Sequence, residues 1–185
     1  MRIFIAVNFP PDVRKQLAFI AEELRKHSSG GRFVKEELFH LTLEFMGNLD
    51  EEEVQRLIRL FHDFTFPSFH LQFYGLGSFK KQKGKTWWLG IKDSSELSAL
   101  KADLHDRLGE AGFPLEERIF RPHVTLGRNL RLSGTVDESK IQALTERIHF
   151  PVEAIHIMLS ESPGGVLTYT SLYEVPAHSY QKKTR

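Results

Sequence analysis

The sequence predicts a duplicated α+β fold with pseudo-two-fold symmetry, and three features of the chain lead to that prediction. Short apolar runs alternate with the period of a β-strand, whereas longer segments carry apolar residues at helical spacing. The motif His-Leu-Thr-Leu at 40–43 returns as His-Val-Thr-Leu at 123–126, an offset of 83 residues. Other predicted elements recur at about the same offset, so we expect a single domain over 1–185 built from an internal duplication.

The first half of the chain predicts strand, helix, strand, helix and strand in that order. The opening segment and the first motif segment are short and rich in β-branched and aromatic residues, as strands are. The segment 12–26 repeats apolar residues every three or four positions, which gives one apolar helix face. Asp50 and Glu53 have the spacing of a capping box, so a helix should begin there. The strands are expected at 2–8, 39–45 and 69–75, and the helices at 12–26 and from Asp50.

The second half repeats this order and adds a closing strand. Leucines at helical spacing predict the first helix, and Gly109 and Gly112 are the expected stop signals after it. Asp137 is the expected cap of a shorter helix. The strands are expected at 86–91, 122–127, 152–159 and 167–174, and the helices at 95–108 and from Asp137.

In each copy of the motif the histidine and the threonine should share one face of the strand. Residues two apart on a strand point the same way, so His40 lies beside Thr42 in the first copy. His123 lies beside Thr125 in the second copy in the same manner. The other face is expected to meet the core, through Leu41, Leu43 and Phe45 in the first copy and Val124 and Leu126 in the second.

These residue types suit displacement at phosphorus. Imidazole is the side chain best able to move protons near neutral pH, and a threonine hydroxyl can donate a hydrogen bond to an anionic oxygen. Two such pairs that face each other supply a base, an acid and two donors for a charged phosphate. A duplicated core strand would also produce a repeated motif. The outward histidine and threonine, however, recur as faithfully as the inward leucine, which favours a functional pair.

Composition limits the remaining choices. The 185 residues, 41% of them apolar, suffice for one well-buried core. A net charge of +1 excludes the global attraction of a polybasic protein, so any contact with nucleic acid must come from a local patch. The absence of cysteine excludes disulfides and thiolate catalysis. No apolar stretch approaches the length of a membrane span, and we expect a soluble, cytoplasmic protein.

Several motifs together resemble the 2H phosphoesterase superfamily. They are the two H-x-T motifs, the opening Arg-Ile-Phe-Ile-Ala-Val, and the segment 118–128, which reads Arg-Ile-Phe-Arg-Pro-His-Val-Thr-Leu-Gly-Arg. The chain is most similar to the bacterial and archaeal RNA 2′,3′-cyclic phosphodiesterases, also called 2′-5′ RNA ligases. Further similarity at 88–90 and 160–169 extends the resemblance over nearly the whole chain.

The resemblance implies two lobes in which antiparallel sheets line a central cleft, with helices outside. It implies that a ribose 2′,3′-cyclic phosphate is opened to a 2′-phosphate without metal or cofactor, with reversible 2′-5′ joining of RNA ends as a second reaction. The implied partner is an RNA with a cyclic phosphate end, such as a tRNA-like fragment or a short oligonucleotide. No membrane contact is implied, and we expect a monomer.

The symmetry of the two motifs leaves open which histidine acts as the base. We expect His123 to accept a proton from water and His40 to donate one to the departing 3′-oxygen. Thr42 and Thr125 are expected to bind the non-bridging phosphate oxygens, although both would also suit a strand as β-branched residues.

Two arginines complete the predicted site. Arg128 lies five residues after His123, so a straight strand would point it away, whereas a bend at Gly127 would return it to the histidine face. The resemblance favours a phosphate contact for Arg128, and Arg118 is expected either to clamp phosphate or to brace its loop. The lysine-rich segment 80–85 is expected to be a hairpin loop that is either merely solvated or attracts an RNA backbone.

The sequence leaves open two alternative functions. One is a phosphodiesterase that acts on a small cyclic or 2′-5′-linked nucleotide. The other is a non-catalytic module that binds RNA ends or phosphate. A binding module has no use for two proton-transfer groups and would be better served by arginines, so the sequence favours an enzyme.

Overall fold

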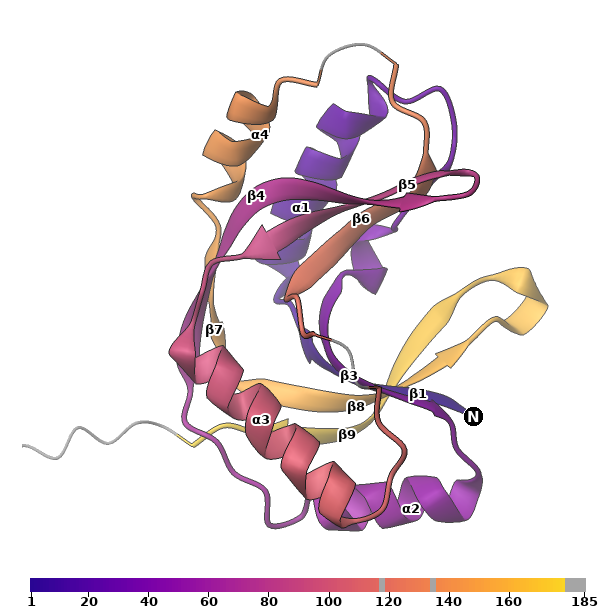
Figure 1. The fold of residues 1–185 in the computed structure, drawn as a ribbon, viewed down its shortest axis with the longest axis vertical. Coiled ribbons are helices and arrows are strands. Elements are labelled where there is room, and N and C mark those ends of the chain that lie inside the picture. The colour runs from indigo at the N-terminus through magenta and orange to yellow at the C-terminus, as the bar shows by residue number, and fades with distance from the viewer. Residues whose placement is uncertain (117–118, 134–135, 179–185) are drawn as a thin grey trace, which may run out of the picture.

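Two antiparallel sheets form the centre of the computed structural model, which describes residues 1–116, 119–133 and 136–178 (Figure 1). The four-stranded sheet has the order β3-β1-β8-β9, and the five-stranded sheet has the order β2-β6-β5-β4-β7. Every pair of neighbouring strands in the two sheets is antiparallel. The predicted α+β fold with antiparallel sheets is therefore confirmed.

The helices and strands follow the predicted order closely. The strands are β1 (Arg2–Asn8), β2 (Arg32–Phe33), β3 (His40–Asn48), β4 (Phe69–Lys81), β5 (Gly84–Ile91), β6 (His123–Leu130), β7 (His149–Val152), β8 (Ala154–Glu161) and β9 (Thr168–Pro176). The helices are α1 (Pro11–Arg25), α2 (Glu51–Leu60), α3 (Ser95–Glu110) and α4 (Glu138–Thr145), with 3₁₀ turns η1 (Glu36–Leu38) and η2 (Pro163–Gly165).

The two sheets repeat one arrangement around the motif strands. In the four-stranded sheet the motif strand β3 pairs with β1, which pairs with β8; in the other sheet β6 pairs with β5, which pairs with β4. Helix α1 follows β1 of the four-stranded sheet and contacts β6 of the five-stranded sheet, whereas α3 follows β5 of the five-stranded sheet and contacts β3 of the four-stranded sheet (Figure 1). Each of these two helices therefore packs against the sheet that does not hold the strand before it. The predicted pseudo-two-fold arrangement is confirmed by this exchange. The duplication that would have produced it remains a prediction.

Local signals set several helix ends. The Asp50 carboxylate accepts a hydrogen bond from the Glu53 amide at 2.8 Å, and the Glu53 carboxylate accepts one from the Asp50 amide at 2.9 Å, which confirms the capping box. Gly109 does not stop α3, which continues to Glu110. Gly112 lies just beyond the helix with φ +76°, a conformation that favours glycine at a helix end.

The prediction that Phe45 faces the core is wrong, because β3 is irregular. Thr42 pairs with Ala6 but Glu44 pairs with Ile5, so Leu43 is an extra residue and forms a β-bulge. Beyond a bulge the alternation of inward and outward side chains reverses. Glu44 is therefore buried at 5% exposure, and Phe45 is 50% exposed.

The strand predicted at 152–159 is present as β8 (Ala154–Glu161), but its predicted start is wrong. The structure has two strands, β7 and β8, separated at Glu153. Strand β7 pairs with β4 in one sheet and β8 pairs with β1 in the other, so the chain crosses between the sheets at this point. The buried positions change phase at the crossing, from Phe150 and Val152 in β7 to Ile155 in β8, because the two strands face the core from different sheets.

The buried side chains of both sheets and of the helices form one contiguous hydrophobic core. Each motif strand contributes its intervening residues to that core, namely Leu41 and Leu43 from β3 and Val124 and Leu126 from β6. The histidines and threonines of the motifs lie on the opposite face of these strands. Among the residues that the structure describes, no helix is long and apolar enough to cross a membrane.

Candidate active site

The two motif histidines are anchored to the backbone in the same way. His40 begins β3, and its Nδ1 lies 2.8 Å from the carbonyl oxygen of Leu38. His123 begins β6, and its Nδ1 lies 2.7 Å from the carbonyl oxygen of Arg121. A carbonyl oxygen only accepts hydrogen bonds, so Nδ1 carries the hydrogen in both rings. Each Nε2 is then the atom that can accept or donate a proton in chemistry.

Aromatic rings fix the position of the His40 imidazole. Phe4 of β1 lies with its ring centroid 4.9 Å from that of His40, and Tyr169 of β9 lies edge-on at 5.0 Å. Phe4 and Tyr169 also contact each other at 5.0 Å. They belong to a small apolar cluster, completed by Ala6 and Met158, that is separate from the main core. The His40 imidazole therefore packs against the rings of Phe4 and Tyr169, and these contacts limit its rotation.

His123 has an equivalent aromatic setting in the other sheet. Phe79 of β4 lies edge-on at 5.3 Å, and Trp88 of β5 lies at 5.7 Å. The Trp88 ring packs so closely over Gly77 that a Cβ atom there would come within 2.3 Å of it. The sequence analysis includes Trp88 only within the stretch 88–90 that extends the resemblance. In the structure Trp88 is half-buried, and its ring packs against the imidazole of His123.

Thr42 and Thr125 each follow their histidine by two residues and lie next to it on the same strand face. Thr42 pairs with Ala6 on β1, and Thr125 pairs with Trp88 on β5. Both threonines are half-buried, and neither hydroxyl is hydrogen-bonded to another residue that the structure describes. Both hydroxyls are thus available to a ligand at the histidines.

A β-bulge returns Arg128 to the histidine face. Thr125 pairs with Trp88 and Gly127 pairs with Trp87, so Leu126 is an extra residue in β6. The sequence predicted a bend at Gly127 for this purpose, and the irregularity lies one residue earlier. The bulge at Leu126 lies 83 residues after the bulge at Leu43, so both motif strands are irregular at the same position of the repeat.

The bulges give the two halves of the site different chemistry. Phe45 is the counterpart of Arg128 at the offset of 83 residues, and each is exposed. Phe45 pairs with Phe4, whose ring packs on His40, so Phe45 lies on the His40 face of its sheet. One half therefore presents a cation beside its motif, and the other presents an aromatic ring.

Electrostatics shows that the two motifs come together. The pKa of His40 is lowered from its ordinary value of 6.5, mainly because burial disfavours the charged ring. The hydrogen bond to the Leu38 carbonyl opposes this effect, whereas the positive charges of Arg128 and His123 add to it. Strands β3 and β6 also contact each other directly. The structure thus places His40, His123 and Arg128 within electrostatic reach of one another, while Arg118 lies outside the described residues.

We expect His40 of the free protein to titrate below 6.5. The folded protein then binds this proton less readily than the unfolded chain, so the free energy of unfolding should decrease as the pH falls below about 6.5. NMR titration of the imidazole signals would check the pKa, with His40→Gln to assign the resonance and to remove this part of the pH dependence. A His40 pKa above 6.5 in the free protein would contradict the burial argument.

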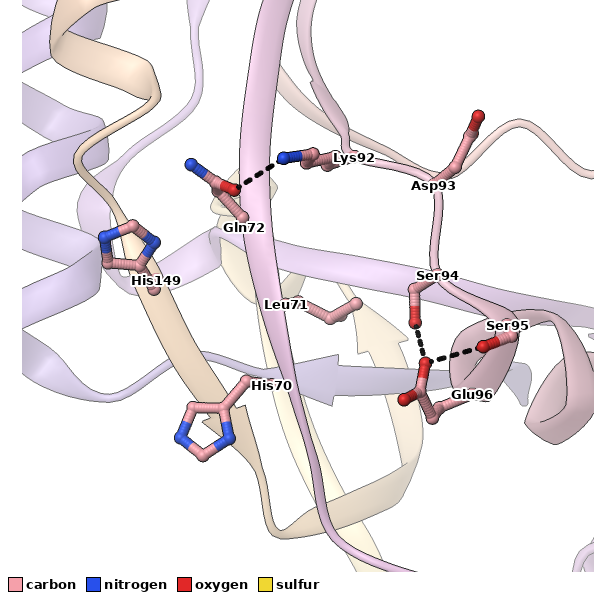
Figure 2. Close-up of a pocket in the computed structure, with 9 residues that line it drawn as sticks. All are labelled: His70, Leu71, Gln72, Lys92, Asp93, Ser94, Ser95, Glu96 and His149. Carbon is pink, nitrogen blue, oxygen red and sulfur yellow. Dashed lines mark hydrogen bonds between the residues drawn. The ribbon is translucent and has the colours of Figure 1, made fainter.

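A separate pocket contains none of the motif residues, and Figure 2 shows its lining. Its polar groups largely satisfy one another: the hydroxyls of Ser94 and Ser95 donate to the Glu96 carboxylate, and Lys92 donates to Gln72. The other lining residues are His70, Leu71, Asp93 and His149. None of the predicted site residues lines this pocket, so we do not assign it to the reaction. Within the described parts of the chain, no group of His, Asp and Glu side chains is placed to hold a metal ion.

Comparison with known proteins supports the expected resemblance. The sequence profile of the 2′-5′ RNA ligase superfamily matches residues 9–163. An RNA 2′,3′-cyclic phosphodiesterase of Thermotoga maritima is 39% identical over 181 residues, which cover 95% of this chain and 92% of that protein.

Solved structures share the fold over nearly the full length. A protein of Thermus thermophilus matches with a TM-score of 0.79 at 25% identity, covering 98% of this chain and 100% of that one. Escherichia coli LigT, solved in complex with 3′-AMP, matches with a TM-score of 0.77 at 24% identity, covering 95% and 97%. Because the profile match spans most of the sequence and a relative at 39% identity covers almost all of it, this chain belongs to the 2′-5′ RNA ligase superfamily.

Proposed function

We propose that this protein hydrolyses RNA 2′,3′-cyclic phosphate ends to 2′-phosphates by paired-histidine acid–base catalysis. The observation that carries the proposal is the pair of imidazoles, each anchored through Nδ1 to a backbone carbonyl and brought together from two sheets with Arg128. The name of the Thermotoga maritima relative, RNA 2′,3′-cyclic phosphodiesterase, supports the same reaction.

The proposed reaction is an in-line displacement with balanced proton transfers. Nε2 of His123 takes a proton from water as the water oxygen attacks phosphorus, and the bond from phosphorus to the 3′-oxygen breaks. Nε2 of protonated His40 gives its proton to the 3′-oxygen. The product has a free 3′-hydroxyl and a 2′-phosphate. With a 5′-hydroxyl of another RNA in place of water, the same steps form a 2′-5′ bond.

The lowered pKa of His40 bears on its role as the acid. In the free protein it favours the neutral ring, which cannot donate the required proton from Nε2. A cyclic phosphate bound between the two rings carries a negative charge, which favours the protonated ring and raises the pKa again. We therefore propose that substrate binding itself charges His40. Binding of inorganic phosphate should accordingly raise the His40 pKa in the NMR titration described above.

The remaining residues of the site act on the phosphate. We propose that the hydroxyls of Thr42 and Thr125 donate to its non-bridging oxygens, where negative charge increases in the transition state. Arg128 is proposed to hold the phosphate by charge and by its planar donors. The expected clamp by Arg118 remains a prediction from the resemblance.

Incubation with a short RNA that ends in a 2′,3′-cyclic phosphate, in the presence of EDTA, tests the proposal. We expect clean conversion to the 2′-phosphate, resolved from the 3′-phosphate by chromatography, because His40 protonates the 3′-oxygen as the leaving group. EDTA should leave the rate unchanged if the histidines act without a metal. A 3′-phosphate product would overturn the assignment of the leaving group, and no turnover of RNA would overturn the proposed substrate.

We further propose that the protein acts as a monomer in the cytoplasm on fragments such as those of tRNA. The cysteine-free composition fits a reducing compartment. Sedimentation velocity at micromolar concentration would test the monomeric state.

A further inference from the structure

Positive charge is segregated on one sheet of this nearly neutral chain. The segments 28–35, 64–92 and 119–133 contain no aspartate or glutamate, although the net charge of the whole chain is only +1. These segments hold β2, β4, β5 and β6, four of the strands of the five-stranded sheet. A local basic surface of this kind is what attracts a nucleic-acid backbone to a protein of low net charge.

Two arginines on this sheet lie directly opposite each other. Arg32 of β2 pairs with Arg128 of β6, and opposite residues of an antiparallel pair point to the same face. Both side chains are exposed, and no carboxylate among the described residues forms an ion pair with either. Like charges directly across a sheet are destabilising unless an anion lies between them. By contrast, Lys140 of α4 and Lys26, just after α1, share the Glu23 carboxylate.

The β4–β5 hairpin extends the same basic surface. Figure 1 shows it projecting beyond the rest of the five-stranded sheet. Phe79 of this hairpin contacts the His123 ring, and Lys81 lies two residues further along the strand, hence on the same face. Lys80 lies between them and points to the other face. Both lysines are exposed, so they differ in direction and not in accessibility.

We propose that Arg128, Arg32 and Lys81 form a phosphate track that binds the RNA backbone on the 5′ side of the reacting cyclic phosphate. Within this track, Arg128 lies nearest the histidines, Arg32 lies opposite it on β2, and Lys81 lies on the β4–β5 hairpin. The ligand class is single-stranded RNA longer than one nucleotide, because a mononucleotide has no backbone phosphate to occupy it. The proposal rests on the proposed function, since the reacting end fixes where the 5′ strand must lie.

Salt-dependent binding of an unreactive RNA tests the track without requiring turnover. The probe is a fluorescent trinucleotide with a 2′-phosphate end, and the variant is Arg32→Ala/Lys81→Ala. Each phosphate contact to a single strand contributes about 0.7 to the slope of log affinity against log salt. Two lost contacts should lower the slope by about 1.4, so from 50 to 200 mM salt the unmodified protein should lose about sevenfold more affinity than the variant.

A matched control separates the track from general charge loss. The variant Arg59→Ala/Lys80→Ala also removes one arginine and one lysine, both exposed, from α2 and from the other face of the hairpin. It should keep the salt slope of the unmodified protein. If both variants lower the slope equally, or if neither does, the track is wrong.

Kinetics distinguishes failure of the track from failure of the proposed function. In the track variant, the ratio of kcat/KM for a cyclic-ended trinucleotide to that for a 2′,3′-cyclic mononucleotide should fall several-fold, whereas the control variant keeps it. Turnover with an unchanged ratio and slope overturns the track alone. Absence of turnover on both substrates overturns the proposed function, and the binding experiment then still decides whether the track exists.

Discussion

His40→Ala and His123→Ala should each reduce hydrolysis of an RNA 2′,3′-cyclic phosphate by about 10²- to 10⁴-fold in kcat, the usual contribution of a positioned acid or base. The loss is expected from either variant alone because attack by water and departure of the 3′-oxygen each require a proton transfer. Single-turnover kinetics with saturating enzyme would measure it. Affinity for inorganic phosphate should fall far less, since Arg128 and the threonines remain.

His70→Ala is the matched control for these variants. His70 is an exposed strand histidine that lines the separate pocket in Figure 2, which contains no motif residue. Its replacement should leave the rate unchanged. If either motif variant kept more than about a tenth of the rate, its histidine would be a structural residue of the strand and the paired-histidine mechanism would be wrong.

A modified substrate assigns the two roles. A cyclic ester with sulfur in place of the 3′-oxygen has a leaving group that needs no proton, since a thiolate is stable near neutral pH. His40→Ala should then recover most of its lost rate on this substrate, whereas His123→Ala should not. The reverse pattern would make His40 the base and His123 the acid. That assignment would agree with the lowered pKa of His40, since burial favours its neutral ring in the free protein.

The sequence predicted the elements of the fold well because most of them carry a strong period. The capping box at Asp50 and the apolar run in β1 are local signals, and both appear in the structure as expected. The sequence failed where tertiary pairing decides the outcome. The crossing at Glu153 depends on which partner strands are available, and local periodicity carries no information about partners.

The site was predictable to the extent that the motif repeats. His40, His123 and their threonines follow from the pattern, but the aromatic rings around them come from strands distant in sequence. The bulge in β3 was not predicted, and the one in β6 was anticipated only as a bend at Gly127, one residue after the extra residue Leu126. The adjacent apolar residues Phe45 and Met46 do not signal the first bulge, because neighbouring strand residues point to opposite faces with or without it, and Phe45 is exposed while Met46 is buried. The same bulge in the second repeat explains the position of Arg128.

Thr42→Val and Thr125→Val should each lower kcat by about 10²-fold, the typical loss when one donor to a developing oxyanion is removed. Valine keeps the β-branched shape that suits a strand, so the substitution removes the hydroxyl and little else. The effect should appear in kcat more than in KM, because the hydrogen bond strengthens as charge accumulates on the phosphate oxygens. Rapid-quench measurements on the cyclic-ended RNA would separate the two parameters.

The outcome of the threonine series decides between two readings of the motif. Thr→Ser keeps the hydroxyl and loses the β-branch, so it should retain most of the rate while lowering the free energy of unfolding slightly. Thr→Val should show the opposite: a stable protein with little activity. If valine is active and serine is not, the threonines are strand formers whose repetition reflects duplication alone. Since the hydroxyls have no partner among the described residues, we expect the first pattern, with each hydroxyl bound to a phosphate oxygen during the reaction.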